Sequence, residues 1–289
     1  MLTTKRKKLN LLLSVFAGSL SFLIFTKIAL WDGLAVRFYT ETTHKVTSAV
    51  RLAVIADLHS SLFGENQSVL AAAIRERRPD ALLFVGDMTH GPEPDYRCAM
   101  LLDAVAGEYP CFFVSGNHEY WSGRCDEIKD MVRSYGVCVL EGEGKKEKIN
   151  GQEIYLAGVD DPVMSASLGL WEDDIYDDWL LQLNRCKNTE SDVYSVLLSH
   201  RPELVSFYEN SGFDLVVSGH AHGGQVRIPF LINGLYSPNQ GYFPKYAGGR
   251  YVFGDTTMIV SRGLCVNNLP RVFNRPEIVI VDIVPESSR

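Results

Sequence analysis

The chain lacks the cysteine patterns that hold small zinc-binding or disulfide-rich proteins together. Its six cysteines form no C-x-x-C pair and show no short regular spacing, so neither a zinc knuckle nor a disulfide scaffold is predicted. Cys111 and Cys138 lie in apolar runs, which favours buried thiols at both positions. The even number of cysteines leaves a disulfide open for a domain that lies outside the cytoplasm.

Repeats, low-complexity tracts and an excess of charge are also absent. Of the 289 residues, 46% are apolar and 22% are charged, which is the composition of an ordinary globular protein. Intrinsic disorder and fibrous structure are therefore excluded. One large domain or two small ones are expected.

Positive charge is scarce beyond residue 40. Residues 41–289 carry 22 Lys and Arg residues against 34 Asp and Glu residues. Proteins bind the phosphate backbone of nucleic acids through clustered Lys and Arg, and an acidic surface repels it. We therefore expect no nucleic acid as a bulk partner.

The N-terminal segment has the opposite character. A basic cluster, Lys5–Lys8, precedes an uncharged stretch, residues 9–26, that would extend about 27 Å as a helix. Trp31 lies just beyond Lys27 and supplies an aromatic anchor for a membrane interface. Small residues at Ala17–Ser19 leave a cleaved secretory signal open. However, apolar sequence resumes directly after them, which favours an uncleaved membrane anchor.

These features divide the chain into three segments. We expect a basic N-terminus and transmembrane anchor at residues 1–31, a linker at residues 32–48, and a globular domain at residues 49–289. Four basic residues precede the apolar stretch, whereas Lys27, Arg37 and Lys45 are spread along and beyond it. The positive-inside rule therefore predicts a single-pass protein of the cell membrane, with the N-terminus in the cytoplasm and the domain outside.

The domain alternates short β-branched runs with amphipathic stretches. Strands are predicted at 52–56, 81–85, 111–114, 137–140, 193–198, 215–218, 251–253, 258–260 and 278–283, and helices at 68–78, 96–106, 126–135, 175–184 and 203–208. The first half has the βαβ rhythm of a parallel sheet. Asn150-Gly151 lies between two strand-like runs and predicts a hairpin, so antiparallel strands are expected as well.

Polar residues follow five of these strands directly. Ligands of open α/β sheets gather beyond the carboxyl ends of the strands, so these positions are the first candidates for a site. Five of the seven histidines lie there. The five motifs are Asp57-Leu58-His59, Gly86-Asp87, Gly116-Asn117-His118-Glu119, Ser199-His200 and Gly219-His220-Ala221-His222-Gly223-Gly224.

The residue types in these motifs are typical of a pair of divalent cations. Imidazole nitrogens with carboxylate or amide oxygens suit Mn, Fe and Zn, and no thiolate accompanies them. The two-residue spacing of Asp57 and His59, and of His220 and His222, directs both members of each pair to one side of an extended backbone. One such histidine alone would more often be structural, whereas five at consecutive strand ends favour a metal site.

The ordered motifs resemble the calcineurin-like metallophosphoesterase superfamily, and the resemblance extends from Arg51 to Asp282. Further phrases resemble the membrane-associated YkuE and YaeI type of bacterial phosphodiesterase. These phrases are Ser199-His200-Arg201-Pro202-Glu203, Gly223-Gly224-Gln225, residues 236–245 and Ser261-Arg262-Gly263.

The resemblance implies an α/β fold, specifically a two-sheet α/β/β/α sandwich, here with one N-terminal transmembrane helix. It also implies two divalent metal ions, Mn, Fe or Zn, as cofactors. One ion would be held by Asp57, His59 and His222. The other would be held by Asn117, His200 and His220, and Asp87 would bridge the two. In the same family pattern His118 is a catalytic residue on the substrate side, where it stabilises charge or protonates the leaving oxygen.

Residues beside this set have weaker signals. Glu119 is interpreted either as a carboxylate that orients a histidine or as a surface carboxylate. His90 could face the site, and Arg201, Arg227 and Arg262 could bind phosphate oxygens or form structural salt bridges. Asp160-Asp161-Pro162 is interpreted as a turn after a strand.

The predicted function is that of a membrane-anchored, metal-dependent phosphoric ester hydrolase. It would cleave a phosphodiester or pyrophosphate bond with a metal-activated hydroxide. The anchor makes the lipid bilayer a partner and favours a lipid-linked substrate, of the UDP-2,3-diacylglucosamine pyrophosphatase type. A phosphodiesterase for soluble small molecules is the alternative. A non-catalytic scaffold of the same fold is less favoured, because neither His118 nor any ligand position is lost.

Overall fold

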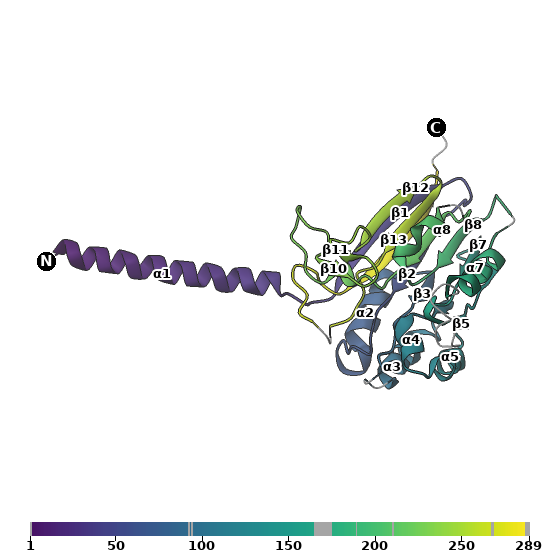
Figure 1. Cartoon of the computed structure of the whole chain (residues 1–289), viewed down its shortest axis with the longest axis horizontal. Helices are drawn as coiled ribbons and strands as arrows, with labels where there is room; N and C mark the ends of the chain where they lie inside the picture. The colour runs from purple at the N-terminus through teal and green to yellow at the C-terminus, as the bar shows by residue number, and fades with distance from the viewer. Residues whose placement is uncertain are drawn as a thin grey trace.

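Two six-stranded sheets face each other in the part of the chain that follows a long N-terminal helix (Figure 1). The computed structural model describes residues 2–91, 93, 95–164, 175–188, 190–209, 211–266 and 269–286. In spatial order, the first sheet contains β1 (Ala35–Thr43), β14 (Glu277–Pro285), β2 (Val50–Ile55), β3 (Ala81–Val85), β4 (Cys111–Val114) and β5 (Cys138–Val139). The second contains β12 (Gly249–Phe253), β13 (Thr256–Val260), β9 (Leu215–Ser218), β8 (Tyr194–Leu198), β7 (Gln152–Gly158) and β6 (Glu143–Ile149).

Both sheets combine a parallel centre with antiparallel pairs. Strands β2, β3, β4 and β5 are parallel, as are β7, β8, β9 and β13. Strand β14 runs antiparallel to β2, and β6 and β12 are antiparallel to their neighbours. The hairpin predicted at Asn150-Gly151 joins β6 and β7, and both turn residues have positive φ, as a two-residue hairpin requires.

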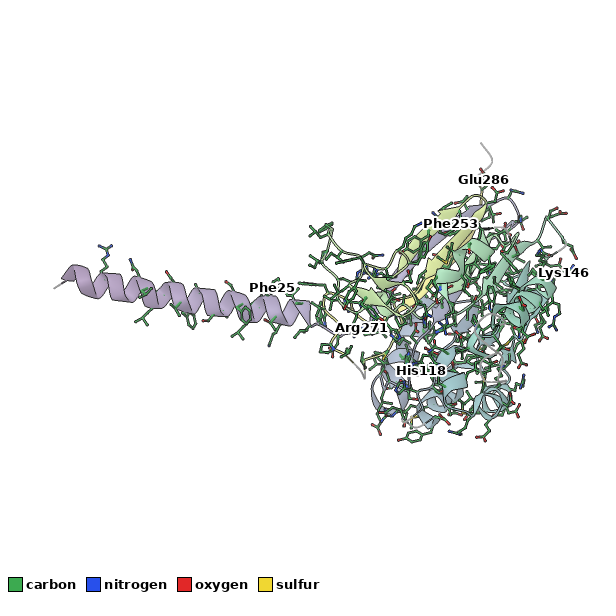
Figure 2. The ribbon with its side chains drawn as sticks, in the orientation of Figure 1. Phe25, His118, Lys146, Phe253, Arg271 and Glu286 are labelled. Atoms are coloured by element: carbon green, nitrogen blue, oxygen red, sulfur yellow. The ribbon has the colours of Figure 1, made fainter. Side chains whose placement is uncertain are left out.

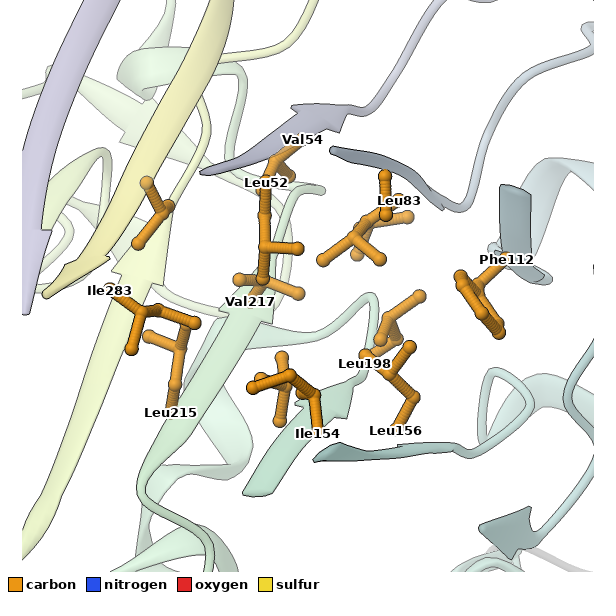
Figure 3. Close-up of a cluster of buried hydrophobic side chains, with 14 of the residues drawn as sticks. Leu52, Val54, Leu83, Phe112, Ile154, Leu156, Leu198, Leu215, Val217 and Ile283 are labelled. Atoms are coloured by element: carbon orange, nitrogen blue, oxygen red, sulfur yellow. The ribbon is translucent and has the colours of Figure 1, made fainter. Parts of the chain in front are cut away.

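Alternating side chains along the strands divide the apolar residues into three layers. Leu52 and Val54 of β2 point toward the other sheet, into a layer that Figure 3 shows between the sheets. Ala53 and Ile55 point the opposite way, against the helices α2 (Ser68–Arg77), α3 (Tyr96–Val105) and α5 (Cys125–Ser134). Helices α7 (Ile175–Arg185) and α8 (Val205–Tyr208) cover the second sheet. The predicted α/β/β/α sandwich is confirmed.

The N-terminal helix α1 (Leu2–Ala29) extends away from the sandwich (Figure 1). Its part from Asn10 to Ala29 is long and apolar enough to cross a membrane, by length and composition, and within it only Ala29 at the C-terminal end is buried. Within the described part of the chain, its C-terminal end contacts the domain. The Phe25 ring lies 5.6 Å from the Phe273 ring, and the Ala29 carbonyl accepts a 2.7 Å hydrogen bond from the Phe273 N–H.

Residues 35–43, which we expected within a linker, form β1 instead. This strand pairs in parallel with β14 over nine residues and so closes one edge of the first sheet. It also joins the two sheets, because the buried Glu41 carboxylate forms a bidentate ion pair with Arg250 of β12 at 2.6 and 2.8 Å. The sequence shows no clear apolar pattern for this strand, because an edge strand exposes half of its residues to water and many of them are polar.

The six cysteines are free thiols. Cys111 is buried as predicted, whereas Cys138 is only half-buried. Burial raises the pKa of Cys111 to about 12 and that of Cys186 to about 12, so these thiols are protonated at neutral pH.

Candidate metal centre

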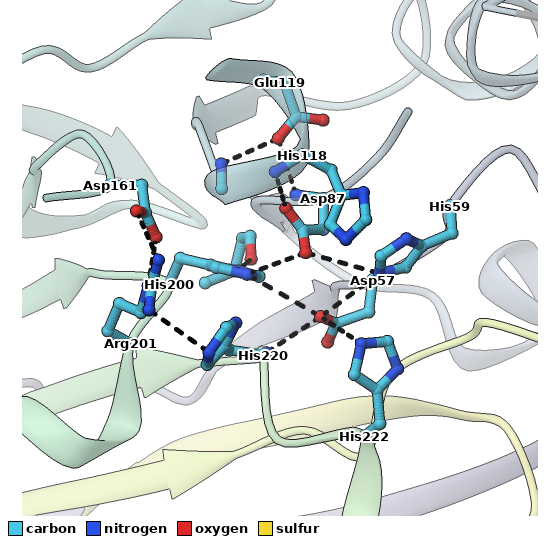
Figure 4. Close-up of polar contacts among 12 residues, drawn as sticks. Asp57, His59, Asp87, His118, Glu119, Asp161, His200, Arg201, His220 and His222 are labelled. Atoms are coloured by element: carbon cyan, nitrogen blue, oxygen red, sulfur yellow. Dashed lines mark hydrogen bonds and ion pairs between the residues drawn. The ribbon is translucent and has the colours of Figure 1, made fainter. Parts of the chain in front are cut away.

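The polar motifs that follow β2, β3, β4, β8 and β9 converge at one edge of the two sheets (Figure 4). The backbone turns sharply as it leaves these strands. Asp57, His59, Asp87, His220 and His222 all have φ between 45° and 64°, the left-handed region that side-chain-bearing residues seldom adopt. Such conformations persist where surrounding structure enforces them, and they concentrate at functional sites. Here they turn five side chains into one small volume.

Two glycines allow the loops to approach this closely. At Gly116 a Cβ atom would collide with the Asp87 carboxylate. At Gly86 a Cβ atom would lie 2.5 Å from Nδ1 of His200, and the φ of +76° adds strain for any other residue. Both positions therefore require the smallest residue for the site to close.

Two groups of donor atoms share Asp87. In one, atoms of Asp57, His59, Asp87 and His222 all lie within 4.8 Å of one another, and in the other, atoms of Asp87, His200 and His220 do. Asp87 Oδ2 lies 3.2 Å from Nε2 of His200 and 3.4 Å from Nε2 of His59. Nitrogen and oxygen ligands about 2.0–2.2 Å from one cation are separated by roughly these distances.

Buried acceptors without a partner show that these residues fit cations. Among the described residues, Oδ2 of Asp57 and Oδ1 of Asn117 are buried and accept no hydrogen bond. A buried polar atom left in this state destabilises a fold unless another group binds it. Asn117 begins α4 (Asn117–Trp121), directly before His118. The donor set of imidazole nitrogens and carboxylate or amide oxygens suits divalent Mn, Fe or Zn.

Neighbouring groups orient the candidate ligands. Nδ1 of His200 lies 2.8 Å from the Val85 carbonyl and must donate to it, which leaves Nε2 facing Asp87. Nε2 of His220 lies 3.0 Å from Oδ1 of Asn239, which leaves Nδ1 for the centre. Asn239 was not identified from the sequence, because its only signal was its place in the family-like stretch 236–245.

Backbone N–H groups fix the two carboxylates. The His118 N–H donates to Asp87 Oδ1 at 2.8 Å, and the His220 N–H donates to Asp57 Oδ1 at 2.9 Å. The second oxygen of Asp87, Oδ2, thereby faces His59 and His200, whereas Oδ1 of Asp57 itself lies 3.7 Å from Nε2 of His222. This orientation is the one that a bridging Asp87 requires.

Burial and mutual charge set the protonation of the centre. Burial raises the pKa of Asp57 to about 7. His200 opposes this rise, and the negative charge of Asp87 adds to it. Burial opposes the charge on His200, but Asp87 and Asp57 raise its pKa to about 10. Burial lowers the pKa of His222 to about 3. It also lowers the pKa of His59, although Asp87 opposes this.

The resulting charge pattern favours metal binding. Burial, reinforced by Arg201, holds the pKa of His220 well below its usual value, so this ring is neutral like those of His59 and His222. Neutral imidazoles offer lone pairs to a cation. The proton on His200 compensates Asp87 in the absence of metal, and a cation would replace it.

Glu119 has a role that neither of its two sequence interpretations described. Its side chain is fully buried and contacts no histidine in the hydrogen bonds described. Its Oε2 accepts from the N–H groups of Asp87 and Gly116, both at 2.8 Å, and Oε1 accepts from the Thr89 N–H at 3.0 Å. Burial, reinforced by Asp87, raises its pKa to about 7. Glu119 thus joins the loops after β3 and β4 beneath the centre.

His118 lies on the open side of the centre. It is half-buried, its ring stacks on His90 at 4.6 Å, and it meets the exposed Trp121 edge-on at 5.0 Å. His90 also lies close to the centre, with Nδ1 3.2 Å from Nδ1 of His59. Burial lowers the pKa of His118, and Asp87 opposes this effect. The resting ring is therefore neutral.

A pocket of about 180 Å³ lies beside these residues. It is lined by Trp121, Pro162, Val163, Arg201, Glu203, Leu204 and Asn239. Arg201 forms a bidentate ion pair with Asp161 at 2.6 and 2.9 Å, and its Nη1 donates to Asn239 at 2.7 Å. Of the two interpretations of Arg201, phosphate binding and a structural salt bridge, the structure therefore supports the salt bridge.

Comparison with known proteins identifies the family. The family model described as calcineurin-like phosphoesterase matches residues 50–224. The chain belongs to this family. It is 31% identical to a metallophosphoesterase of Aquifex aeolicus over 86% of this chain and 92% of that protein. Identity is 28% with YkuE of Bacillus subtilis (75% and 72% covered) and 26% with the phosphodiesterase YaeI of Escherichia coli (81% and 82%).

Family membership confirms three of the sequence predictions. The protein is a metallophosphoesterase of the YkuE and YaeI type, the class is metal-dependent phosphoester hydrolase, and the calcineurin-like fold uses a dinuclear divalent metal centre. The clusters that share Asp87 are where the described structure offers such a centre.

The position of Glu119 generates a first prediction. Glu119→Gln replaces an acceptor with an NH₂ group that faces backbone N–H donors, so at least one hydrogen bond is lost inside the protein. We expect the free energy of unfolding to fall by about 1–3 kcal/mol, measured by urea denaturation of the full-length protein in detergent. The matched control is Glu127→Gln, whose side chain is 68% exposed. Equal stability of the two variants would contradict this role.

Proposed function

We propose that the chain is a membrane-anchored phosphoesterase that cleaves a phosphodiester or pyrophosphate bond at a dinuclear centre. Asp57, His59 and His222 hold one ion, Asn117, His200 and His220 hold the other, and Asp87 bridges them. The observation that carries this proposal is the pair of donor clusters that share the Asp87 carboxylate. In domain terms, residues 1–31 are the anchor and the phosphoesterase domain is residues 49–289, to which β1 is added.

The protein positions the reacting phosphate and excludes bulk water from the ligands. When bound, the ions would polarise the phosphoryl oxygens and lower the pKa of an attacking water. Asp57 and Asp87 are less than 2% exposed, so they compensate positive charge in a medium where electrostatic interactions are strong. Glu119 and the backbone N–H of His118 hold Asp87 in its bridging orientation.

His118 serves the leaving group. Hydrolysis breaks one phosphorus–oxygen bond, and the departing oxygen must gain a proton or a hydrogen bond. The His118 ring is the half-buried imidazole on the open side, next to the pocket at Trp121. The neutral ring can donate its N–H to this developing charge, and a ring that has first gained a proton from solvent can protonate the leaving oxygen.

The connection between α1 and the centre supports a substrate in the membrane. Nδ2 of Asn274 donates to the His222 carbonyl at 2.7 Å. The residue before it, Phe273, contacts Phe25 and Ala29 of α1. A spanning α1 would therefore hold the centre close to the lipid headgroups. A lipid-linked phosphodiester or pyrophosphate, of the UDP-2,3-diacylglucosamine pyrophosphatase type, is the proposed substrate. A soluble phosphodiester is the alternative that a substrate panel would reveal.

Metal content tests the ligand assignment. Asp87→Ala removes the shared ligand and should lose both ions, whereas His59→Ala or His222→Ala should mainly lose one. Elemental analysis of full-length protein reconstituted with Mn, Fe or Zn at neutral pH measures this directly. His44→Ala, an exposed histidine outside the clusters, is the control and should keep two ions. Wild-type protein that binds no metal would refute the centre.

Kinetics test the role of His118. His118→Ala should retain both ions but lower kcat on an alkyl phosphodiester by roughly 10²–10⁴. A nitrophenyl ester should lose less, because its leaving group is stable without a proton. Metal content and kcat are measured on the same preparation, with His44→Ala as the control. Unchanged kcat on both substrates would exclude the role.

Protease accessibility tests the topology. We propose that the N-terminus is cytoplasmic and the domain lies outside the cell membrane. Protease added to intact spheroplasts should degrade the domain and spare a cytoplasmic marker, and the chain should stay with membranes through a high-salt wash. A domain digested only after lysis would reverse the orientation. A shortened soluble form would show that the N-terminal segment is cleaved.

A further inference from the structure

An apolar hairpin projects from the domain with its side chains in water. It consists of residues 228–232, Ile-Pro-Phe-Leu-Ile, and is closed by hydrogen bonds between Ile228 and Ile232 at 2.9 and 3.1 Å. Phe230 is fully exposed, and Leu231 and Ile228 are 80% and 44% exposed. Five consecutive apolar residues without an intervening polar one are unusual on a soluble surface and indicate a binding partner.

The tip of the apolar hairpin is also strained. Phe230 has φ of +68°, a left-handed conformation that is an outlier for a bulky residue. This conformation leaves the Phe230 ring in water, where it is not packed against the protein interior. Such an outlier is expected where exposure of the side chain serves a function.

The hairpin emerges beside the end of α1. The Arg227 N–H donates to the Val272 carbonyl at 2.9 Å, and the following residue, Phe273, donates to Ala29 of α1. Two backbone steps therefore connect the base of the hairpin to the helix end. Figure 2 shows Phe25 on the helix next to the domain, Arg271 on the side of the domain that faces the helix, and Lys146 on the opposite side.

Two exposed aromatic residues extend the same surface. Tyr242 and Phe243 are 74% and 65% exposed and belong to or follow β11 (Gly241–Tyr242), which pairs with β10 (Tyr236–Ser237). Figure 1 shows β10 and β11 on the side of the domain that faces α1. Tyrosines and other aromatic residues gather at the interface between membrane and water.

Behind the hairpin, three arginines lie near one carboxylate, that of Glu277. Arg37 and Arg262 each form an ion pair with the Glu277 carboxylate at 3.5 Å. Arg227 is close enough to interact electrostatically with the same carboxylate. Nη1 of Arg227 and Nε of Arg262 are buried and have no hydrogen-bond partner among the described residues. One carboxylate against three guanidinium groups leaves an excess positive charge next to an apolar loop. This combination is complementary to anionic lipid headgroups above acyl chains.

We propose that the apolar hairpin inserts into the membrane interface and that the positive charge of Arg37, Arg227 and Arg262 behind it attracts anionic headgroups. The occupant of this surface is the lipid bilayer itself. The inference rests on the proposed membrane anchoring by α1 and adds a second contact. With α1 alone the domain could swing on its tether, whereas two contacts would fix the open side of the metal centre relative to the lipid surface.

The experiment measures how deep the hairpin lies in a bilayer. Phe230→Cys in the full-length chain is labelled with a nitroxide and reconstituted into vesicles of phosphatidylcholine with phosphatidylglycerol. Collision rates with oxygen, which concentrates in lipid, and with a water-soluble nickel complex are read by electron spin resonance. The matched control is Leu181→Cys on α7, a site 55% exposed on the second sheet's helical face. Labelling of the six native cysteines is measured with wild-type protein carried through the same procedure.

The expected result is a severalfold higher ratio of oxygen to nickel collisions at residue 230 than at residue 181. A label at 230 that is as open to nickel as the label at 181, in protein that stays with the vesicles, would overturn the docking surface and leave the anchor intact. Protein that does not stay with the vesicles would overturn both.

Lipid charge tests the arginines without a substitution. The label at 230 should lie deeper in vesicles with phosphatidylglycerol than in pure phosphatidylcholine, and the difference should shrink at high salt because headgroup attraction is screened. Equal depth in both vesicles would overturn the role of Arg37, Arg227 and Arg262.

Discussion

The carboxylate of Asp87 is buried between imidazoles from two different sheets, and much of the structure serves to hold it there. It is 1% exposed and lies 3.4 Å or less from His59 of the first sheet's loops and His200 of the second's. A buried charge is unstable unless positive charge and hydrogen bonds compensate it. Two cations that share this carboxylate would satisfy Asp87 and the unpartnered oxygen of Asp57 together.

The surrounding loops are built to meet this requirement at a conformational cost. Left-handed backbone at Asp57, His59 and Asp87 is unfavourable for residues with side chains, and Gly86 and Gly116 leave no room for a Cβ atom. The regular sheets offset this cost, because three apolar layers on and between them bury the side chains of the central strands β3, β4, β8, β9 and β13. These strained positions lie at the edge where the chemistry of the family takes place.

The same edge connects the centre to the N-terminal helix. Asn274 holds the backbone at His222, Phe273 contacts the end of α1, and the pairing of Arg227 with Val272 carries the chain on to the apolar hairpin. A short, hydrogen-bonded path therefore joins the metal ligands, the candidate span and the exposed apolar surface. In the function proposed above, this path would hold the centre near the membrane surface.

The sequence by itself determined the fold class, the parallel and antiparallel parts of the sheets, and which residues the structure brings together in the candidate site. Each of these depends on local information: alternation of apolar residues, the Asn150-Gly151 turn, and polar motifs directly after strands. It did not reveal β1, because an edge strand with half its side chains in water has no clear apolar pattern. Nor did it reveal the hydrogen bonds of Glu119 and Asn239, or the partner of the Arg201 salt bridge. The hydrogen bonds of Arg201 with Asp161 and of His220 with Asn239 join residues 40 and 19 positions apart. They have no local signature and arise only when segments distant in the sequence come together in the fold. Tertiary structure alone decided these partners, since packing determines which polar groups are buried together and must satisfy one another.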